Sequence, residues 1–447
     1  MRFRTALAAA VVICTTATPL AAQTAQDFPD LAPAIGPWIG AARGSISDVT
    51  PGDGQISLSA VVRDPDSAQG VDYEILVDGR VRGSGTAPRP AGFGDEATLN
   101  ATVNATPGLH EVCLRLDDPQ LGTRTVDCRD AVTAPEPTVD PAVAAAATGV
   151  AISQTGVVLP ILGGTPNNLQ VRTPCGATAT VTNAEIVERA QIVIDPGHGG
   201  SETGAVGAGL LEKNVNLVVS EVVIDKFESL GITAELTRTF DYRVPIQTRA
   251  DIATALAPDV FLSLHHNGGA VRRSSEPGTE IFYGQARPES QRLARILYEE
   301  MFAAASQFDA QWVSTVNQGA STRLRGDGLD LFGIHRFSPD IDSVITEFLY
   351  LSNTSEAQLM NRADVIEAQA QSIVDGILRW WFEDDNPETP GRRFTDPSSS
   401  GTGGFDACVD PPLNGPSQLS AEEVTNAVDD APALLPALLL GRDPAVG

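Results

Sequence analysis

Residues 192–200 read Ile-Val-Ile-Asp-Pro-Gly-His-Gly-Gly, an apolar run that gives way to a glycine-rich turn carrying a histidine. A buried strand that ends in this way belongs at the edge of a parallel sheet, where open α/β folds build their sites. Gly197, Gly199 and Gly200 lack the Cβ atoms that would keep a metal or substrate away from the backbone, and Pro196 stiffens the approach. We therefore expect His198 to face an open cleft.

Three further segments carry polar side chains at comparable positions. Glu212 opens an amphipathic run, and the apolar stretch 260–264 leads directly into His265-His266-Asn267. The stretch 343–353 holds Glu347 among residues that are otherwise almost wholly apolar. Three of the five histidines of the chain thus fall in two turns, which chance would rarely produce.

The surrounding pattern alternates strands with helices. Val215, Val218, Val222 and Phe227 form one apolar face at helical spacing, and Gly231 ends that helix. A strand follows at 233–236, and further helices are expected at 293–301 and 366–381. The sequence predicts an α/β fold with a mostly parallel, twisted sheet covered by helices on both faces.

Taken in order, four motifs resemble the zinc-dependent N-acetylmuramoyl-L-alanine amidases of the bacterial cell wall. They are Asp-Pro-Gly-His-Gly-Gly, Glu-Lys-x-x-Asn, Ser-x-His-x-Asn and Thr-Glu-Phe-x-x-x-Ser-Asn, and the resemblance spans roughly residues 190–382. It also includes Leu236-Thr237-Arg238, Asp241, Arg249, Gly278-Thr279-Glu280 and Ser290. The resemblance implies a metal held by His198, Glu212 and His265. It also implies hydrolysis of the amide bond that joins the lactyl group of N-acetylmuramic acid to L-alanine of the peptidoglycan stem peptide.

The chemistry of these residues leads to the same metal set. Two imidazoles and one carboxylate leave a tetrahedral Zn²⁺ with one open position, as in catalytic sites. We expect one Zn²⁺ per catalytic domain, with a bound water whose pKa falls to roughly 7. A carboxylate must still move the proton from that water to the departing amine, and Glu347 suits this role, as the resemblance also implies.

Other interpretations of these residues stay open. Glu212 could simply favour a helix N-terminus, and Glu347 could neutralise a buried arginine, Arg249 or Arg336. We expect His266 to line the cleft rather than bind metal, and we expect His266, Asn267 and Arg336 to contact substrate. His335 is expected to be structural or to contact substrate, and His110 to lie on the surface.

Other activities fit less well. The glycines of residues 204–209 fail the G-x-G-x-x-G spacing of a dinucleotide site, and no G-x-S-x-G nucleophile elbow occurs. The alternatives to an amidase are another zinc peptidase that acts within the stem peptide, or a catalytically silent wall-binding or regulatory protein. The intact ligand set and Glu347 argue against the silent protein.

Residues 1–22 resemble a secretory signal peptide, with Arg2 and Arg4 before an apolar stretch and a small-residue site near Ala22. We expect a secreted or otherwise extracytoplasmic protein, in the cell wall or periplasm. Four cysteines then remain in an oxidising compartment. We favour the pairs Cys113–Cys128 and Cys175–Cys408, although four cysteines allow three pairings.

The rest of the chain divides by composition and strand pattern. The expected segments are a linker at 23–44, an all-β immunoglobulin-like sandwich at 45–133, a Pro/Ala-rich linker at 134–147, a small SH3-like β unit at 148–184, the catalytic domain at 188–384, and a flexible tail at 385–447 with a short helix at 420–423. A wall-binding role and a spacer role are equally open for the sandwich.

Charge and hydropathy restrict the partners. The 57 acidic and 30 basic residues give a net charge of −27, and loss of Arg2 and Arg4 with the signal would make it −29. Such a charge argues against nucleic acid or an anionic membrane surface as a partner. No segment after the signal reaches the roughly 20 apolar residues of a membrane span. Peptidoglycan is the expected partner, and an unidentified activator protein is left open.

Overall fold

The computed structural model describes residues 42–52, 54–64, 70–88, 96–118, 122–135, 139–315, 318–396 and 403–415. The predicted signal peptide, nearly all of the 23–44 linker and the predicted helix at 420–423 lie outside the described residues. Two compact units divide the chain near Asp130, with segments 49–57 and 102–111 grouped with the second unit. Among the described helices, none is long and apolar enough to cross a membrane.

The amino-terminal region is built of strands, as predicted. They are β1 (Arg43–Gly52), β2 (Gln55–Arg63), β3 (Val71–Val77), β4 (Arg80–Ala87), β5 (Ala97–Asn104), β6 (Gly108–Asp118) and β7 (Gly122–Thr133). They form a three-stranded sheet in the order β1-β2-β5 and a four-stranded sheet in the order β4-β3-β6-β7. Alternate residues of β2 are buried, namely Ile56, Leu58, Ala60 and Val62. A Cβ on Gly44 would lie 3.0 Å from Val62 and 3.2 Å from Leu114, so β1 faces one strand of each sheet.

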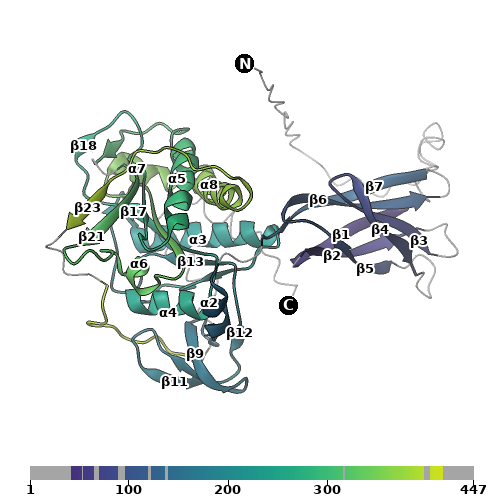
Figure 1. Ribbon diagram of the computed structural model, residues 1–447, viewed down its shortest axis with the longest axis horizontal. Coiled ribbons are helices and arrows are strands. Elements are labelled where there is room, and N and C mark those ends of the chain that lie inside the picture. Colours follow the sequence, from purple (N-terminus) through teal and green to yellow (C-terminus); the bar gives the residue numbers. More distant parts are fainter. Residues whose placement is uncertain are drawn as a thin grey trace, which may run out of the picture. The chain divides into compact units, whose positions relative to one another are not determined.

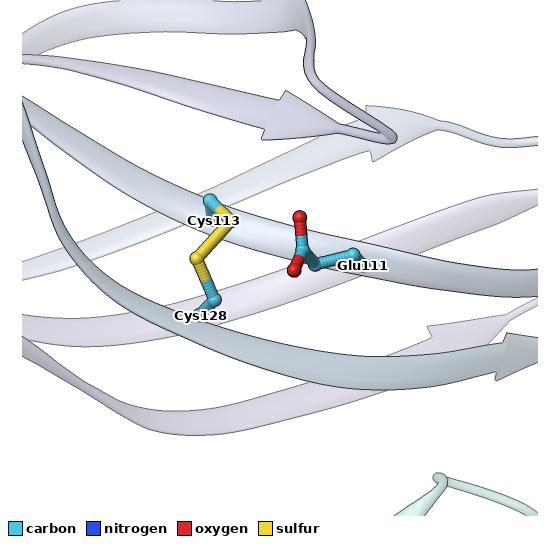
Figure 2. Close-up of side chains that lie close together, drawn as sticks. All are labelled: Glu111, Cys113 and Cys128. Carbon is cyan, nitrogen blue, oxygen red and sulfur yellow. A yellow bond between two sulfur atoms is a disulfide. The ribbon is translucent and has the colours of Figure 1, made fainter. Parts of the chain in front are cut away.

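A disulfide joins Cys113 of β6 to Cys128 of β7, which are neighbouring strands of one sheet. Figure 2 shows this bond with the carboxylate of Glu111, two residues earlier on β6, beside it. The expectation that His110 lies on the surface is wrong: its side chain is buried, with Nε2 2.6 Å from the carbonyl oxygen of Thr106.

The segment expected as a plain linker contains a helix, α2 (Pro141–Ala146). Asp140 caps it by accepting a hydrogen bond from the Ala142 N–H, and proline occupies the first turn. Proline has no N–H to leave unpaired at this position, and alanine is the strongest helix former, so the local sequence favours this short helix. Composition alone suggested a linker because these same residue types also occur in extended spacers.

A five-stranded sheet follows, and it is larger than the two strands that the sequence suggested. Its order is β11-β10-β9-β8-β12, and the pairings that join these strands are antiparallel. The strands are β8 (Val150–Ile152), β9 (Val158–Thr165), β10 (Asn168–Arg172), β11 (Thr178–Val181) and β12 (Glu185–Val187).

A seven-stranded sheet forms the centre of the second unit, in the order β16-β13-β17-β22-β19-β21-β23. Figure 1 labels β13, β17, β21 and β23 of this sheet. Its strands are β13 (Ile192–Pro196), β16 (Ala234–Leu236), β17 (Val260–Asn267), β19 (Glu280–Tyr283), β21 (Gly319–Arg325), β22 (Asp342–Tyr350) and β23 (Arg393–Asp396). Neighbouring strands are parallel except at the β19–β22 pair, which is antiparallel. The predicted α/β class with a mostly parallel sheet is therefore correct.

Alternation along the strands divides the apolar side chains between the two faces of this sheet. The helices that cover it are α3 (Glu212–Ser229), α4 (Ile246–Leu256), α5 (Pro288–Ala305), α6 (Gly333–Phe337), α7 (Thr354–Leu359) and α8 (Ala363–Phe382). Ile192, Ile194, Val260, Leu262 and Leu264 pack with α3, α5 and α8. Val193 and Phe261 pack on the other face with α4 and α6 and with the five-stranded sheet. Short strands β14 (Val206–Gly207), β15 (Leu210–Leu211), β18 (Arg272–Arg273) and β20 (Val313–Ser314) form two ribbons.

The described part of the predicted flexible tail is instead attached to the second unit. Strand β23 extends the central sheet by pairing with β21, and Cys408 is joined to Cys175 by a disulfide. Asp410 accepts hydrogen bonds from the Thr173 hydroxyl at 2.8 Å and the Cys175 N–H at 2.7 Å. The Pro, Ser and Gly content of this segment favoured a loop, but the strand pairing and the disulfide hold it.

Candidate active site

His198 lies in the turn that follows β13 at the carboxyl edge of the sheet. It adopts a left-handed backbone conformation, with φ of 62°, which is uncommon for a residue with a side chain. The turn continues the parallel pairing, because the Gly197 N–H donates to the Leu264 carbonyl at 2.9 Å. A Cβ on Gly197 would lie 2.2 Å from Cε1 of His265, so only glycine lets that ring lie against the backbone.

His198, Glu212 and His265 come together although they belong to three separate elements. Their candidate ligand atoms all lie within 4.8 Å of one another. Oε1 of Glu212 is 3.2 Å from Nε2 of His198 and 3.0 Å from Nδ1 of His265. Two imidazole nitrogens and a carboxylate that converge in this way have the donor chemistry of a zinc site with an open fourth position.

The Glu212 carboxylate is fixed before any ligand arrives. It is the first residue of α3, where the helix dipole favours an acid. Its Oε2 accepts from the Ala205 N–H at 2.6 Å, and its Oε1 accepts from the His266 N–H at 3.1 Å. Burial acts to raise the pKa of Glu212, but the hydrogen bonds and charges of His198 and His265 prevail and lower it below its usual value. Glu212 is therefore held as the anion that a metal cation needs.

Glu347 lies beside this group because of strand register. It pairs with His265 across β17 and β22, and with Glu280 across β22 and β19. Residues opposite one another on neighbouring strands project from the same face of a sheet. One face at the carboxyl end of the sheet therefore presents an imidazole and two carboxylates in a row.

Oε2 of Glu347 is buried and has no hydrogen-bond partner among the described residues. Burial raises the pKa of Glu347 well above its usual value, and the nearby charges of Glu212 and Glu280 add to this effect. The alternative that Glu347 neutralises a buried arginine is wrong within the described structure: Arg249 pairs with Asp195, and Arg336 donates to the carbonyls of Asp330 and Leu331.

Asp195 and two buried arginines hold the His198 turn in place. Asp195 accepts from the hydroxyls of Thr237 and Ser263 and from Arg249. Its burial acts to raise its pKa, but Arg249 and these hydrogen bonds lower the pKa overall. Arg249 also donates to the carbonyl of His198 at 2.5 Å, and Arg238 donates to the carbonyls of Pro196 and Gly197. Both arginines lie in the sequence motifs, but their role in holding this turn was not predicted. The available signal was Asp195, an ionisable residue inside an apolar strand.

The expectation that His266 lines the cleft is wrong. Its side chain is only 1% exposed, with Nδ1 2.8 Å from Oδ1 of Asn216 and Nε2 3.2 Å from Oε1 of Gln369. Burial lowers the pKa of His266 to about 4, so the ring is neutral. Adjacent strand residues point to opposite faces, and His266 continues the series Val260, Leu262 and Leu264 that faces α3 and α8.

The other two predicted substrate contacts differ from each other. Asn267 is half-buried at the end of β17, and its Nδ2 donates to Oε2 of Glu280 at 2.9 Å. Arg336 follows His335, whose Nδ1 lies 2.8 Å from the Ser343 hydroxyl near the start of β22. Because Glu347 lies four residues further along this strand, Arg336 is at the opposite end of the sheet from the metal group, and we no longer expect it to contact substrate there.

The last motif, Ser352-Asn353, has a structural explanation. The Ser352 hydroxyl accepts from the Gly269 N–H at 2.9 Å, which ties the loop after β17 to the end of β22. Asn353 caps α7 by accepting from the Ser355 N–H at 3.0 Å. Both residues stabilise loops that border the candidate site.

Known proteins are similar to this chain over the same region. Residues 192–379 match the family model described as N-acetylmuramoyl-L-alanine amidase. Protein YqiI of Bacillus subtilis, described as uncharacterized, is 33% identical over 207 residues, which cover 45% of this chain and 92% of that protein. N-acetylmuramoyl-L-alanine amidase LytC of Bacillus subtilis is 33% identical over 192 residues, which cover 42% of this chain and 35% of LytC. The solved N-acetylmuramoyl-L-alanine amidase AmiC2 of Nostoc punctiforme is 28% identical, with a TM-score of 0.36, and the match covers 42% of this chain and 95% of AmiC2.

Proposed function

Since this chain belongs, through residues 192–379, to the N-acetylmuramoyl-L-alanine amidase family, we propose that it hydrolyses one amide bond of peptidoglycan. The bond joins the lactyl group of N-acetylmuramic acid to L-alanine of the stem peptide. The observation that carries this proposal is the convergence of His198, Glu212 and His265, within 4.8 Å, next to Glu347.

The three converging residues would hold one Zn²⁺ per catalytic domain. Their chemistry fits this ion, because zinc takes imidazole and carboxylate ligands and a catalytic site keeps one position open. Bound there, the ion would polarise the scissile carbonyl and lower the pKa of a water molecule to roughly 7. The hydrogen bonds to Glu212 from the Ala205 and His266 N–H groups keep this carboxylate oriented toward the two imidazoles.

Glu347 would move the proton. Its unpartnered Oε2 is available to take a proton from the attacking water and to deliver it to the amine of the departing L-alanine. The raised pKa supports this role, since burial and the neighbouring carboxylates make Glu347 a stronger base toward the water, and the protonated group can then act as an acid toward the amine.

The other domains would support a secreted wall enzyme. We infer that residues 45–133 form an immunoglobulin-like sandwich, which the three- and four-stranded sheets support. Its disulfide departs from the antibody pattern, because it joins neighbouring strands of one sheet rather than two sheets. Residues 148–184 would form a reduced SH3-like unit and residues 188–384 the catalytic domain. The two disulfides support export to an oxidising compartment.

Digestion of purified sacculi by the mature protein tests the reaction, with the released ends identified by mass spectrometry. We expect new lactyl carboxylates on muramic acid and new free amines on L-alanine. New ends inside the stem peptide would indicate a zinc peptidase instead, and no new ends would indicate a silent wall-binding or regulatory protein.

The variant Glu347→Gln tests the proton-transfer role, because it removes the carboxylate but keeps nearly the same side-chain volume. We expect turnover to fall by roughly 10²–10⁴-fold, because general acid–base help is lost. Zinc content and melting temperature should stay at the wild-type values, since the three ligands are untouched and Glu347 has no arginine partner among the described residues. A stable, zinc-loaded and fully active variant would remove Glu347 from the mechanism.

A further inference from the structure

Strands β18 and β20 form a short antiparallel ribbon that carries two adjacent arginines. Arg272 pairs with Ser314, and Arg273 pairs with Val313. Both arginine side chains are exposed, and Val271 before them is 92% exposed. We call this pair of strands the arginine ribbon.

The arginine ribbon borders the candidate site on both of its strands. Arg272 comes five residues after Asn267, whose side chain donates to Glu280. On the other strand, Thr315 directly follows β20 and donates its hydroxyl to Oε1 of Glu280 at 2.5 Å. Because Glu280 lies opposite Glu347 in the sheet, the arginine ribbon stands at the rim beside the proposed proton carrier.

Arg272 and Arg273 form no side-chain hydrogen bond or ion pair with another described residue. Each other arginine described between residues 139 and 415 has a side-chain hydrogen bond or ion pair with another described residue, Arg392 excepted. Residues 268–279 contain one acidic residue, Glu276, in a chain whose net charge is −27. Two guanidinium groups without a partner among the described residues therefore add positive charge at this rim, beside the carboxylates of Glu280 and Glu347.

We propose that Arg272 and Arg273 bind carboxylates of the stem peptide and so select an anionic peptide as the substrate. A guanidinium group offers paired N–H donors that match a carboxylate, and its charge is insensitive to pH. A positive rim also offsets the repulsion that an acidic protein exerts on an anionic substrate. This inference rests on the proposed amidase function and adds the part of the substrate that the arginine ribbon recognises.

The test compares two soluble N-acetylmuramoyl-peptides, one with free peptide carboxylates and one with those groups amidated. The double variant Arg272→Gln/Arg273→Gln is measured beside Arg392→Gln, which removes an exposed arginine from the segment leading into β23. We expect the double variant to lower kcat/KM on the free acid by about three- to ten-fold through KM, the range expected for a pair of exposed ionic contacts. On the amidated peptide it should match the wild type, as Arg392→Gln should on both. Added salt should shrink the wild-type preference for the free acid.

The outcomes separate the two levels of the argument. An active wild type whose double variant keeps full kcat/KM on the free acid contradicts the role of the arginine ribbon alone. An equal loss on both peptides also contradicts it, because a general structural effect would then be responsible. A wild type that cleaves neither peptide nor sacculi contradicts the proposed amidase function itself.

Discussion

Two places in the described chain bring three residues with metal-ligating side chains together, and only one of these groups suits a metal. Glu111, Cys113 and Cys128 meet on β6 and β7, while His198, Glu212 and His265 meet at the carboxyl edge of the central sheet. In the first group the two sulfur atoms are bonded to each other (Figure 2), so no thiolate remains to bind a cation. In the second group no ligand atom is taken up by a crosslink, and the Glu212 carboxylate accepts hydrogen bonds from the Ala205 and His266 N–H groups. Closeness of metal-ligating side chains is therefore not enough to make a metal site. The cysteines must also be reduced, and hydrogen bonds must hold the ligands in place.

The two groups also differ in the hydrogen bonds that hold their ligands in place. Glu212 accepts hydrogen bonds from two backbone N–H groups. In the His198 turn, backbone carbonyls accept hydrogen bonds from Arg249 and Arg238. Such partners hold ligands in one geometry and keep them in the protonation state that a metal requires. The first group consists of side chains on two neighbouring strands, and its disulfide serves to crosslink them.

The largest expected effect follows from breaking the second group. His198→Ala or His265→Ala should abolish zinc retention and reduce turnover on sacculi to background, since two protein ligands cannot replace three. His266→Ala is the adjacent control and should retain the metal, because that side chain faces α3 and α8. Zinc analysis on folded, purified proteins checks this. Stoichiometric zinc in a folded His198→Ala protein would contradict the assignment of His198 as a zinc ligand.

A smaller effect, on stability alone, should follow from breaking the first group. Cys113→Ser/Cys128→Ser opens a bridge between residues 15 positions apart. Loop-closure entropy then predicts a loss of about 3 kcal/mol in the free energy of unfolding of the amino-terminal sheets. Zinc content and turnover should not change. Chemical denaturation alongside zinc analysis measures both quantities, and a fall in zinc content would mean that the two groups are not functionally separate.

The convergence of the candidate metal ligands was predictable from sequence because these residues end apolar strands or begin the helix that follows one. Parallel strands bring such ends to one edge, so His198, Glu212 and His265 needed no knowledge of long-range packing. Glu347 stood out for a related reason, since a carboxylate inside an apolar strand is rare, and its position opposite His265 agrees with the role proposed for it.

Other features required the three-dimensional structure. His266 could have been placed correctly, since strand alternation groups it with Leu262 and Leu264, but the cluster of polar residues around it favoured the cleft. Arg336 was misplaced because sequence distance does not reveal which end of β22 its helix contacts. The pairing of β23 with β21 depends on residues about 70 positions apart, and no local pattern signals such a partner.

The chemical surroundings of the bound zinc test the central claim most directly. X-ray absorption at the zinc edge of the purified wild-type protein reports the ligand atoms without any substitution. We predict only nitrogen and oxygen neighbours at about 2.0–2.2 Å, with the scattering pattern of two imidazoles. A sulfur neighbour at about 2.3 Å would mean that cysteine thiolates bind the ion, and it would contradict the assignment to His198, Glu212 and His265.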